Sequence, residues 1–224
     1  MNKFIPTIVS RPQSSNLMNV LVPVIAVILT LLTGSIIFSI MGFNPFFALH
    51  TFFISPISTS YGISELLVKA TPLALIAIGL AFCFKNNIYN IGAEGQLTMG
   101  AIFGGGIGIY FYDTNAFWLL PLMILGGAIG GALWAMIPAL LKTKFNTNEI
   151  LTSLMLVYVA LLILDYLVVG PWKDPLGYSF PKTRQFSESG RMPLLFSGLR
   201  VHFGLIITLV LIFFSWFIFS KTIF

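Results

Sequence analysis

Charged side chains are scarce in this sequence of 224 residues. Asp, Glu, Lys and Arg together make up 8% of it, whereas hydrophobic residues make up 57%. Soluble domains carry about 25% charged residues. In water, a chain this apolar would expose far more hydrophobic surface than one core could bury. The composition therefore excludes an ordinary soluble domain and predicts a protein surrounded by lipid.

Cysteine and histidine are also rare. A single cysteine, Cys83, excludes a disulfide or a Cys-x-x-Cys metal site within this sequence. His50 and His202 lie far apart, with no cysteine or second histidine near either, so we expect no metal site. The 12 Lys and Arg residues form no dense cluster, which argues against nucleic acid as a partner.

Signatures of catalysis are missing too. The sequence has no G-x-S-x-G motif, no H-E-x-x-H motif and no Gly-Lys dipeptide, which a phosphate-binding ATPase loop requires. We therefore expect no catalytic residues and no cofactor bound to this chain. If ATP drives the protein, another subunit binds the ATP.

Long hydrophobic runs, in contrast, are abundant. A helix needs about 20 apolar residues to cross a bilayer. Segments of about that length are 17–41, 66–85, 91–112, 116–141, 150–169 and 201–220. We therefore predict an all-α fold, a polytopic integral membrane helix bundle with about six transmembrane helices, forming a single domain over residues 1–224.

Two longer polar stretches separate these runs. Residues 44–64 form a semi-polar connector, part of which we expect to lie as a short helix in the membrane interface. Residues 170–200 form a long loop with four prolines and several charges. Lysines in or beside the short loops 86–90 and 142–149 favour a cytoplasmic N-terminus, which places the long loop outside the cytoplasm.

The stretch NIYNIGAEGQLTMG, residues 87–100, places polar groups and glycines beside a membrane segment. A carboxylate within such a segment costs about 2.5–3.5 kcal/mol and usually faces protein or water. Glu94 therefore either lines a polar pathway or neutralises Lys85 or the positive end of its helix. Asn90 is a candidate cap for that helix.

A second polar stretch, KTKFNTNE at 142–149, precedes another apolar run. Asn146 and Glu149 have the N-x-x-E spacing of a capping box, which would explain Glu149 as a structural residue. Asn148 adds a further polar group at the same helix start, so a role of this stretch in a pathway stays open.

Glycines recur at helical spacing. They form the GxxxG pattern Gly100, Gly104 and Gly108, and the pairs Gly126/Gly130 and Gly127/Gly131. Glycines at this spacing let helices approach closely in lipid. We expect packing within the bundle, with a dimerisation face as the alternative.

The two polar motifs together resemble those of a known family. NIGAEGQ, from Asn90 to Gln96, and the NEIxxxLML run, from Asn148 to Leu156, are similar to motifs in membrane permease subunits of bacterial binding-protein-dependent ABC importers. The likeness points to the nucleoside and simple-sugar branch, in the larger group that includes branched-chain amino acid permeases. PWKDPLGYSFPKT, at 171–183, resembles the extracytoplasmic loop of that branch, and the likeness covers about residues 15–224.

The resemblance implies a multi-pass permease of the bacterial cell (inner) membrane that translocates a nucleoside or simple sugar by alternating access. It implies as partners a second permease, cytoplasmic ATPase subunits that bind the ATP, an extracytoplasmic substrate-binding protein, the solute and membrane lipid. By analogy, the pathway residues are Asn90, Glu94, Gln96, Asn148 and Glu149.

Members of the family are longer, with further helices and a cytoplasmic loop that docks the ATPase. The chain is therefore expected to be the N-terminal part of a longer permease. Two other functions stay open. One is an ion-coupled secondary transporter that uses Glu94 or Glu149, although we find no internal repeat of the kind such transporters show. The other is a non-transporting membrane scaffold held together by the glycine faces.

Overall fold

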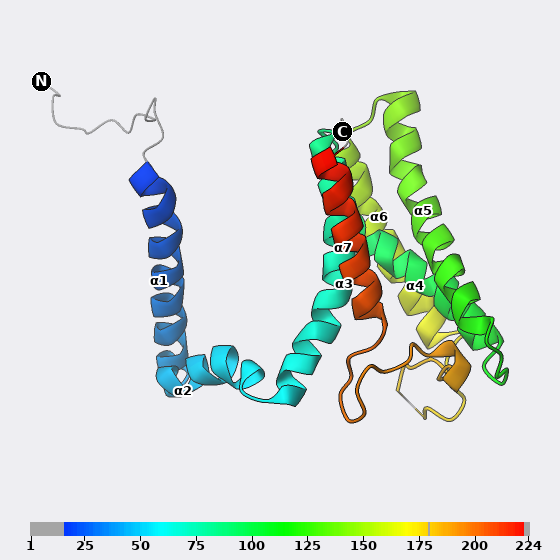
Figure 1. The fold of residues 1–224 in the computed structure, drawn as a ribbon, viewed down its shortest axis with the longest axis horizontal. Coiled ribbons are helices and arrows are strands. Elements are labelled where there is room, and N and C mark those ends of the chain that lie inside the picture. The colour runs from blue at the N-terminus through cyan, green and yellow to red at the C-terminus, as the bar shows by residue number, and fades with distance from the viewer. Residues whose placement is uncertain (1–15, 179, 222–224) are drawn as a thin grey trace, which may run out of the picture. The chain divides into compact units, whose positions relative to one another are not determined.

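The computed structural model of the protein describes residues 16–178 and 180–221. Helices dominate this part of the chain, and its β-structure is limited to two isolated bridges in the loop before the last helix. The elements are α1 (Asn16–Ile40), α2 (Pro45–Leu49), η1 (His50–Ile54), η2 (Ser55–Ile57), α3 (Ser60–Lys85), α4 (Ala93–Tyr110), α5 (Leu119–Phe145), α6 (Glu149–Val169), η3 (Glu188–Gly190) and α7 (Gly204–Lys221) (Figure 1). The predicted all-α fold is confirmed.

Five helices among the described residues are long and apolar enough to cross a membrane. They are α1 from Leu17 onward, α3, α5, α6 and α7. Helix α4 has 18 residues, but Glu94, Gln96 and its glycines make it less apolar than the other five. The structure thus has the polytopic helical character that the sequence predicts, with one polar helix in the place of a predicted span.

Several helices differ in length from the predicted segments. Helix α3 begins at Ser60 instead of residue 66, and α5 continues to Phe145 instead of ending at 141. Both extensions pass through polar residues, which hydropathy counts against a span although they can remain helical. Helix α4 is shorter than the predicted 91–112, because residues 88–92, which precede Ala93, are not helical.

The chain forms two compact units, residues 1–63 and 64–224. In the described part of the first unit, α1 exposes apolar side chains such as Leu17, Val20 and Ile40. A helix that is apolar on all sides is typical of a lipid-exposed or buried span. The connector contains the short helices α2, η1 and η2, and Asn44 caps α2 by accepting hydrogen bonds from Phe46 N and Phe47 N. That residues 1–224 form a single domain stays a prediction.

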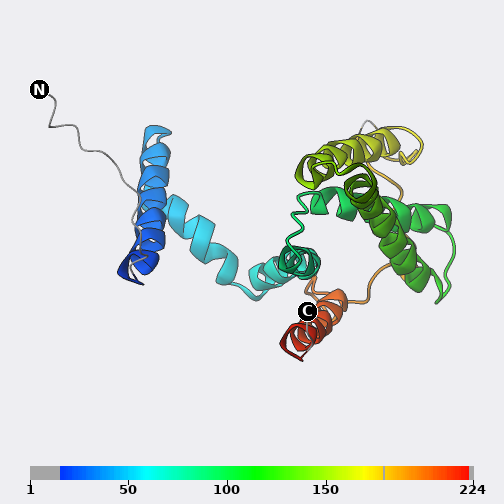
Figure 2. The ribbon, with the colours of Figure 1, turned by 90° about the horizontal axis from the view of Figure 1, so that it is seen from above.

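In the second unit, α4 packs between α5 and α6 (Figure 2). A Cβ added to Gly104 would lie 2.7 Å from the Met123 carbonyl oxygen on α5. On the other side, a Cβ added to Gly95 would lie 2.9 Å from Val157 Cα on α6. These glycines therefore serve close packing inside the bundle, as the GxxxG spacing indicates.

Three contacts join α3 to α7 and the segment that leads into it. Near one end of the unit, the rings of Phe82 and Phe219 lie 4.4 Å apart, and Lys85 Nζ lies 4.7 Å from the centre of the Phe219 ring. Near the other end, Arg200 Nη1 lies 3.2 Å from Glu65 Oε2. Helices α3 and α7 therefore run side by side (Figure 1).

The long loop lies at the end of the second unit opposite the turns 86–92 and 146–148 (Figure 1). Ser189 of the loop donates to the Thr114 carbonyl oxygen at 3.0 Å and accepts from Ala116 N at 3.2 Å.

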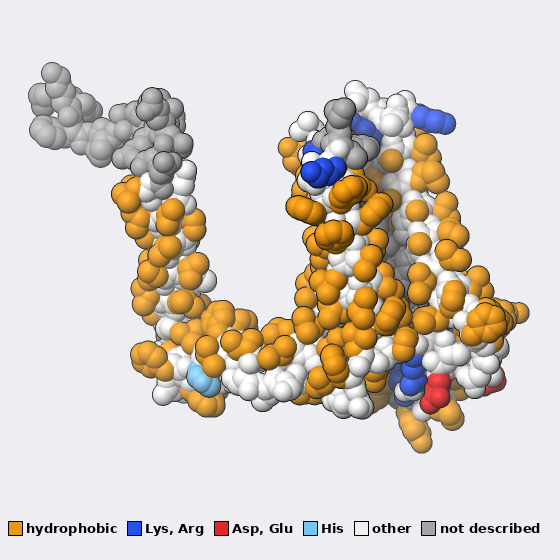
Figure 3. Space-filling view, in the orientation of Figure 1, with side chains coloured by type: hydrophobic (Ala, Val, Ile, Leu, Met, Phe, Trp, Pro, Cys, Tyr) orange, Lys and Arg blue, Asp and Glu red, His pale blue; other side chains and the backbone are white. Residues whose placement is uncertain are grey.

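Basic side chains lie at the end of the second unit where α3, α5 and α7 finish (Figure 3). The orientation in the membrane stays a prediction.

Candidate functional site

Two adjoining cavities lie beside α4 in the second unit. The first cavity has a volume of about 580 Å³ and is bounded by α3, α4 and α5. The second cavity has a volume of about 480 Å³ and extends toward the turn between α5 and α6. Both lie within the range of about 300–1,000 Å³ that is typical of small-molecule sites. They share the lining residues Cys83, Asn90, Gln96 and Ala135.

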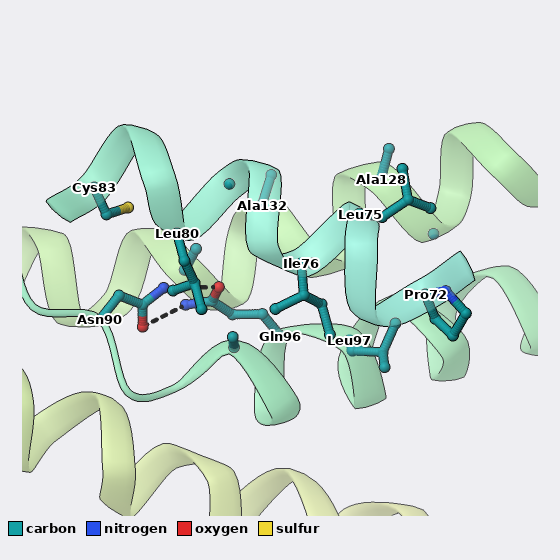
Figure 4. Close-up of a pocket in the computed structure, with 15 residues that line it drawn as sticks. Pro72, Leu75, Ile76, Leu80, Cys83, Asn90, Gln96, Leu97, Ala128 and Ala132 are labelled. Atoms are coloured by element: carbon teal, nitrogen blue, oxygen red, sulfur yellow. Dashed lines mark hydrogen bonds between the residues drawn. The ribbon is translucent and has the colours of Figure 1, made fainter. Parts of the chain in front are cut away.

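The side chains of Asn90 and Gln96 form a reciprocal pair where the two cavities meet (Figure 4). Asn90 Nδ2 donates to Gln96 Oε1 at 3.1 Å, and Gln96 Nε2 donates to Asn90 Oδ1 at 3.3 Å. Asn90 Oδ1 also accepts from Gly92 N at 2.9 Å. Asn90 and Gln96 contribute the side-chain carboxamides to the lining of the first cavity. The other residues of that lining are largely apolar.

The backbone that carries Asn90 is held by the helices on both sides of it. Helix α3 ends because Asn87 has a positive φ of 55°, a conformation that Asn tolerates better than most residues. Ile88 N then donates to the Cys83 carbonyl oxygen at 3.0 Å. Further on, Ile91 N donates to the buried hydroxyl of Ser153 on α6 at 3.2 Å. Non-helical backbone within a membrane protein is tolerated where it is buried in protein or lines a cavity of this kind.

Gly92 is required where this segment approaches α6. A Cβ at Gly92 would lie 2.8 Å from the Ser153 carbonyl oxygen. Such a contact is too short for any side chain, so a larger residue would push the segment away from α6. Gly92 is also the residue that precedes the first turn of α4. The predicted capping role of Asn90 is therefore modified: Asn90 bonds Gly92 N and does not cap the helix itself.

The turn between α5 and α6 contains two asparagines with different structural roles. Asn146 closes α5 with a positive φ of 50°. Asn148 caps α6, because its Oδ1 accepts from Ile150 N at 3.0 Å and from Leu151 N at 3.4 Å. The predicted capping box of Asn146 with Glu149 is therefore wrong: Asn146 belongs to the end of the preceding helix.

Glu149 is instead paired across this turn. Its Oε2 lies 2.9 Å from Lys142 Nζ, so the ion pair ties the start of α6 to the last turns of α5. Both side chains line the second cavity, together with Thr143 and Ser153. The second cavity is thus lined by more polar and charged side chains than the first.

Three of the five predicted pathway residues lie together at the cavities: Asn90, Gln96 and Glu149. Asn148 is exposed and is used as a cap. Glu94 is exposed on the first turn of α4 and belongs to neither lining. Among the described residues it has no ion pair, and Lys85 contacts Phe219 instead, so pairing of Glu94 with Lys85 is wrong. A role of these five residues in a pathway stays a prediction.

Sequence reasoning missed the contribution of α3 to this site. Pro72, Ile76, Leu80 and Cys83 of this helix line the first cavity. Nothing in the local sequence distinguishes them from lipid-facing residues, because both surfaces are apolar. Thr143 was missed for a similar reason: its hydroxyl donates to the Ala139 carbonyl oxygen of its own helix, as any helical threonine can.

Comparison with known proteins decides what kind of protein carries these cavities. Residues 62–224 match the family described as "Branched-chain amino acid transport system / permease component". The chain belongs to this family. The resemblance seen in the sequence motifs is thereby confirmed, and the permease is a multi-pass protein of the cell membrane.

Curated relatives of this permease are named for transport. It is 34% identical to the glucose ABC transporter permease protein TsgB13 of Haloferax volcanii over 89% of this chain and 55% of the relative. It is 32% identical to the guanosine ABC transporter permease protein NupP of Bacillus subtilis over 92% of this chain and 59% of the relative. No solved structure matches it. The chain thus spans a little over half the length of the curated relatives it matches.

Proposed function

We propose that the chain is part of a membrane-spanning permease subunit of an ATP-driven importer, which translocates a nucleoside or simple sugar by alternating access. The observation that carries this proposal is the first cavity. None of the described residues that line it carries a charge, and Asn90 and Gln96 offer neutral hydrogen-bonding groups. A zwitterionic amino acid would need charged partners in such a site, whereas a neutral hydroxyl-bearing solute would not.

The packing around the first cavity is compatible with movement of one helix, α3, against the other two. Helices α4 and α5 meet through backbone contacts at Gly100 and Gly104, which leave little freedom between them. Helix α3 faces this pair across the cavity. Movement of α3 against a rigid α4–α5 pair would open and close the cavity without breaking the glycine contacts, which is the kind of change that alternating access requires.

The proposed partners follow from what the sequence lacks and from the names of the relatives. The chain has no Gly-Lys dipeptide and so no ATP-binding loop of the usual kind. The relatives are named as permease proteins of ABC transporters. We therefore place ATP binding on separate cytoplasmic ATPase subunits, and we add a second permease and an extracytoplasmic substrate-binding protein as partners.

Purification of the native gene product from its own membranes, followed by mass spectrometry of what accompanies it, tests this proposal. We expect an ATPase subunit with a phosphate-binding loop to co-purify, and the reconstituted complex to take up guanosine or glucose only when ATP is present. Uptake driven by a proton or sodium gradient without ATP would instead identify a secondary transporter. A complex that takes up neither solute under any condition would favour the scaffold.

A further inference from the structure

We propose that the Asn90–Gln96 pair binds the base of a nucleoside in the first cavity, and that the second cavity holds its sugar. This inference rests on the proposed function. It selects nucleosides over simple sugars, the two solute classes that the proposed function includes.

The pair has hydrogen-bonding capacity to spare. An amide group has two donors and an oxygen that accepts twice. Asn90 Oδ1 already accepts from Gly92 N and from Gln96 Nε2, so it is saturated. One N–H on each side chain and one lone pair on Gln96 Oε1 are left unused by the described bonds. Asn90 Nδ2 and Gln96 Oε1 share one hydrogen bond, so their unused donor and acceptor lie side by side.

An adjacent donor and acceptor match the edge of a nucleobase. Bases present paired donors and acceptors along one edge, and carboxamide side chains pair with such edges, as Asn and Gln do with adenine. The remaining walls of the first cavity suit the flat faces of a base, because Ile76, Leu80 and Leu97 are apolar. One polar edge between apolar walls is therefore the pattern that the cavity presents.

A simple sugar fits the first cavity less well. A hexose carries hydroxyl groups around its whole ring, and each buried hydroxyl that lacks a partner lowers the affinity. The pair offers three unused positions on one side, and the side chains of the opposite α3 wall, such as Ile76 and Leu80, offer none. The cavity would leave most of the hydroxyls of a bound hexose unpaired.

The second cavity supplies what a ribose needs. It begins at the same carboxamide pair and is lined by Asn87, Thr143 and Glu149. No hydrogen bond is described for the Asn87 side chain, and the Glu149 carboxylate keeps acceptor positions beyond its contact with Lys142. A base held at Asn90 and Gln96 would thus have its sugar directed toward groups that bind hydroxyls.

Cys83 provides a reporter for occupancy of this site. It lies in the linings of both cavities, next to the carboxamide pair (Figure 4), and it is the single cysteine of the sequence. A solute bound there should shield its thiol from a small neutral reagent. The label is assigned to Cys83 by mass spectrometry of the peptide, so cysteines elsewhere in the full-length transporter do not interfere.

The experiment uses the full-length transporter in proteoliposomes, with N-ethylmaleimide as the reagent and guanosine, uridine, ribose and glucose as solutes. We expect both nucleosides to slow labelling of Cys83 by at least about fivefold, and ribose and glucose to leave the rate nearly unchanged at the same concentration. Gln96→Leu removes the polar edge and keeps the volume, so it should weaken nucleoside protection and nucleoside uptake about tenfold, as the loss of two hydrogen bonds implies. Thr98→Val removes a hydroxyl from the same helix outside both cavities and should change neither.

The outcomes separate this inference from the proposed function. Protection by glucose that equals protection by guanosine, or a Gln96→Leu variant with unchanged nucleoside affinity, would overturn the nucleoside site while ATP-driven uptake still stood. A Cys83 that does not react in the empty transporter would show that another segment fills the cavity, which also overturns it. Absence of ATP-driven uptake of every solute would remove the proposed function and this inference together.

Discussion

Lys142 and Glu149 join the last turns of α5 to the first residue of α6 through an ion pair of 2.9 Å. Seven positions separate them in the sequence, yet the turn brings the two charges together on the wall of the second cavity. Loss of one partner leaves the other charge alone on that wall, whereas loss of both leaves a neutral wall.

This relationship predicts a coupled effect on transport. Lys142→Met and Glu149→Gln should each lower the uptake rate, and the double variant should lie closer to the wild type than either single one. Measurement of all four proteins at matched membrane levels gives the coupling directly. Strictly additive losses would show that the two side chains act independently. Glu149→Gln at wild-type activity would make Glu149 a purely structural residue.

Removal of the cap from α6 should destabilise the protein. Asn148→Ala removes both hydrogen bonds to the first turn, which costs about 0.5–2 kcal/mol in comparable helices. The matched change Asn148→Ser keeps an oxygen that can cap and should cost less. Unfolding in mixed micelles measures both. Equal stability of Asn148→Ala and the wild type would contradict the assignment of the cap.

At the end of α5, position 146 should tolerate glycine better than alanine. Asn146 has a positive φ, so Asn146→Ala should cost about 1–2 kcal/mol in left-handed backbone strain. Asn146→Gly removes the same side chain without that strain and should be nearly neutral. The comparison of their thermal stabilities separates backbone conformation from side-chain contacts. A destabilised glycine variant would assign Asn146 a side-chain role instead.

Close packing of α4 on α5 should not tolerate an added methyl group. Gly104→Ala would place Cβ 2.7 Å from the Met123 carbonyl oxygen, and overpacking of this kind costs about 1–3 kcal/mol. Gly34→Ala in α1 is the control, because no atom lies within 4 Å of its added Cβ. Thermal stability of the purified protein should fall for the first variant and stay level or rise for the second. A Gly104→Ala variant with the thermal stability of the wild type would contradict the close contact of α4 with α5.

Glu94 tests how far the pathway extends. Its side chain is exposed and belongs to neither cavity lining, so Glu94→Gln should insert normally and retain uptake close to the wild type. Loss of the favourable interaction with the positive end of α4 should cost less than about 1 kcal/mol. Abolished uptake at a normal protein level would place Glu94 in the pathway, as the motif resemblance implies.

The orientation in the membrane is open to a labelling test. Ser197 is exposed in the long loop, whereas Lys144 is exposed at the opposite end of the second unit. With a cytoplasmic N-terminus, Ser197→Cys should react with an impermeant maleimide in intact cells, and Lys144→Cys should react only after lysis. The reverse result would invert the topology.

Much of the fold was open to prediction because membrane helices are signalled locally. Apolar runs of sufficient length predicted α1, α3, α5, α6 and α7 within a few residues at most ends. The ends themselves were less accurate, since Ser60 and Phe145 lie beyond the apolar runs that hydropathy detects. Two short motifs pointed to the family, which the family match confirmed.

The candidate site was predicted only in part. The motif placed Asn90 and Gln96 in the right region, but their mutual hydrogen bonds depend on the turn that brings residue 90 back over the first turn of α4. The choice between Asn146 and Asn148 as the cap of α6 depended on where α5 ends. Both asparagines fit a cap by residue type, and only the backbone conformation distinguishes them.

By itself, the sequence determined that the protein is a helical membrane protein of a permease family. Both signals are local, because a membrane helix needs only one continuous apolar run and each family motif occupies only a few residues. The tertiary structure decided which polar groups meet. Cys83, Gln96 and Ala135 come from three different helices, and no local pattern records that they border one cavity. Helix packing places them there, because glycine contacts let α4 and α5 approach closely while α3 remains across the cavity.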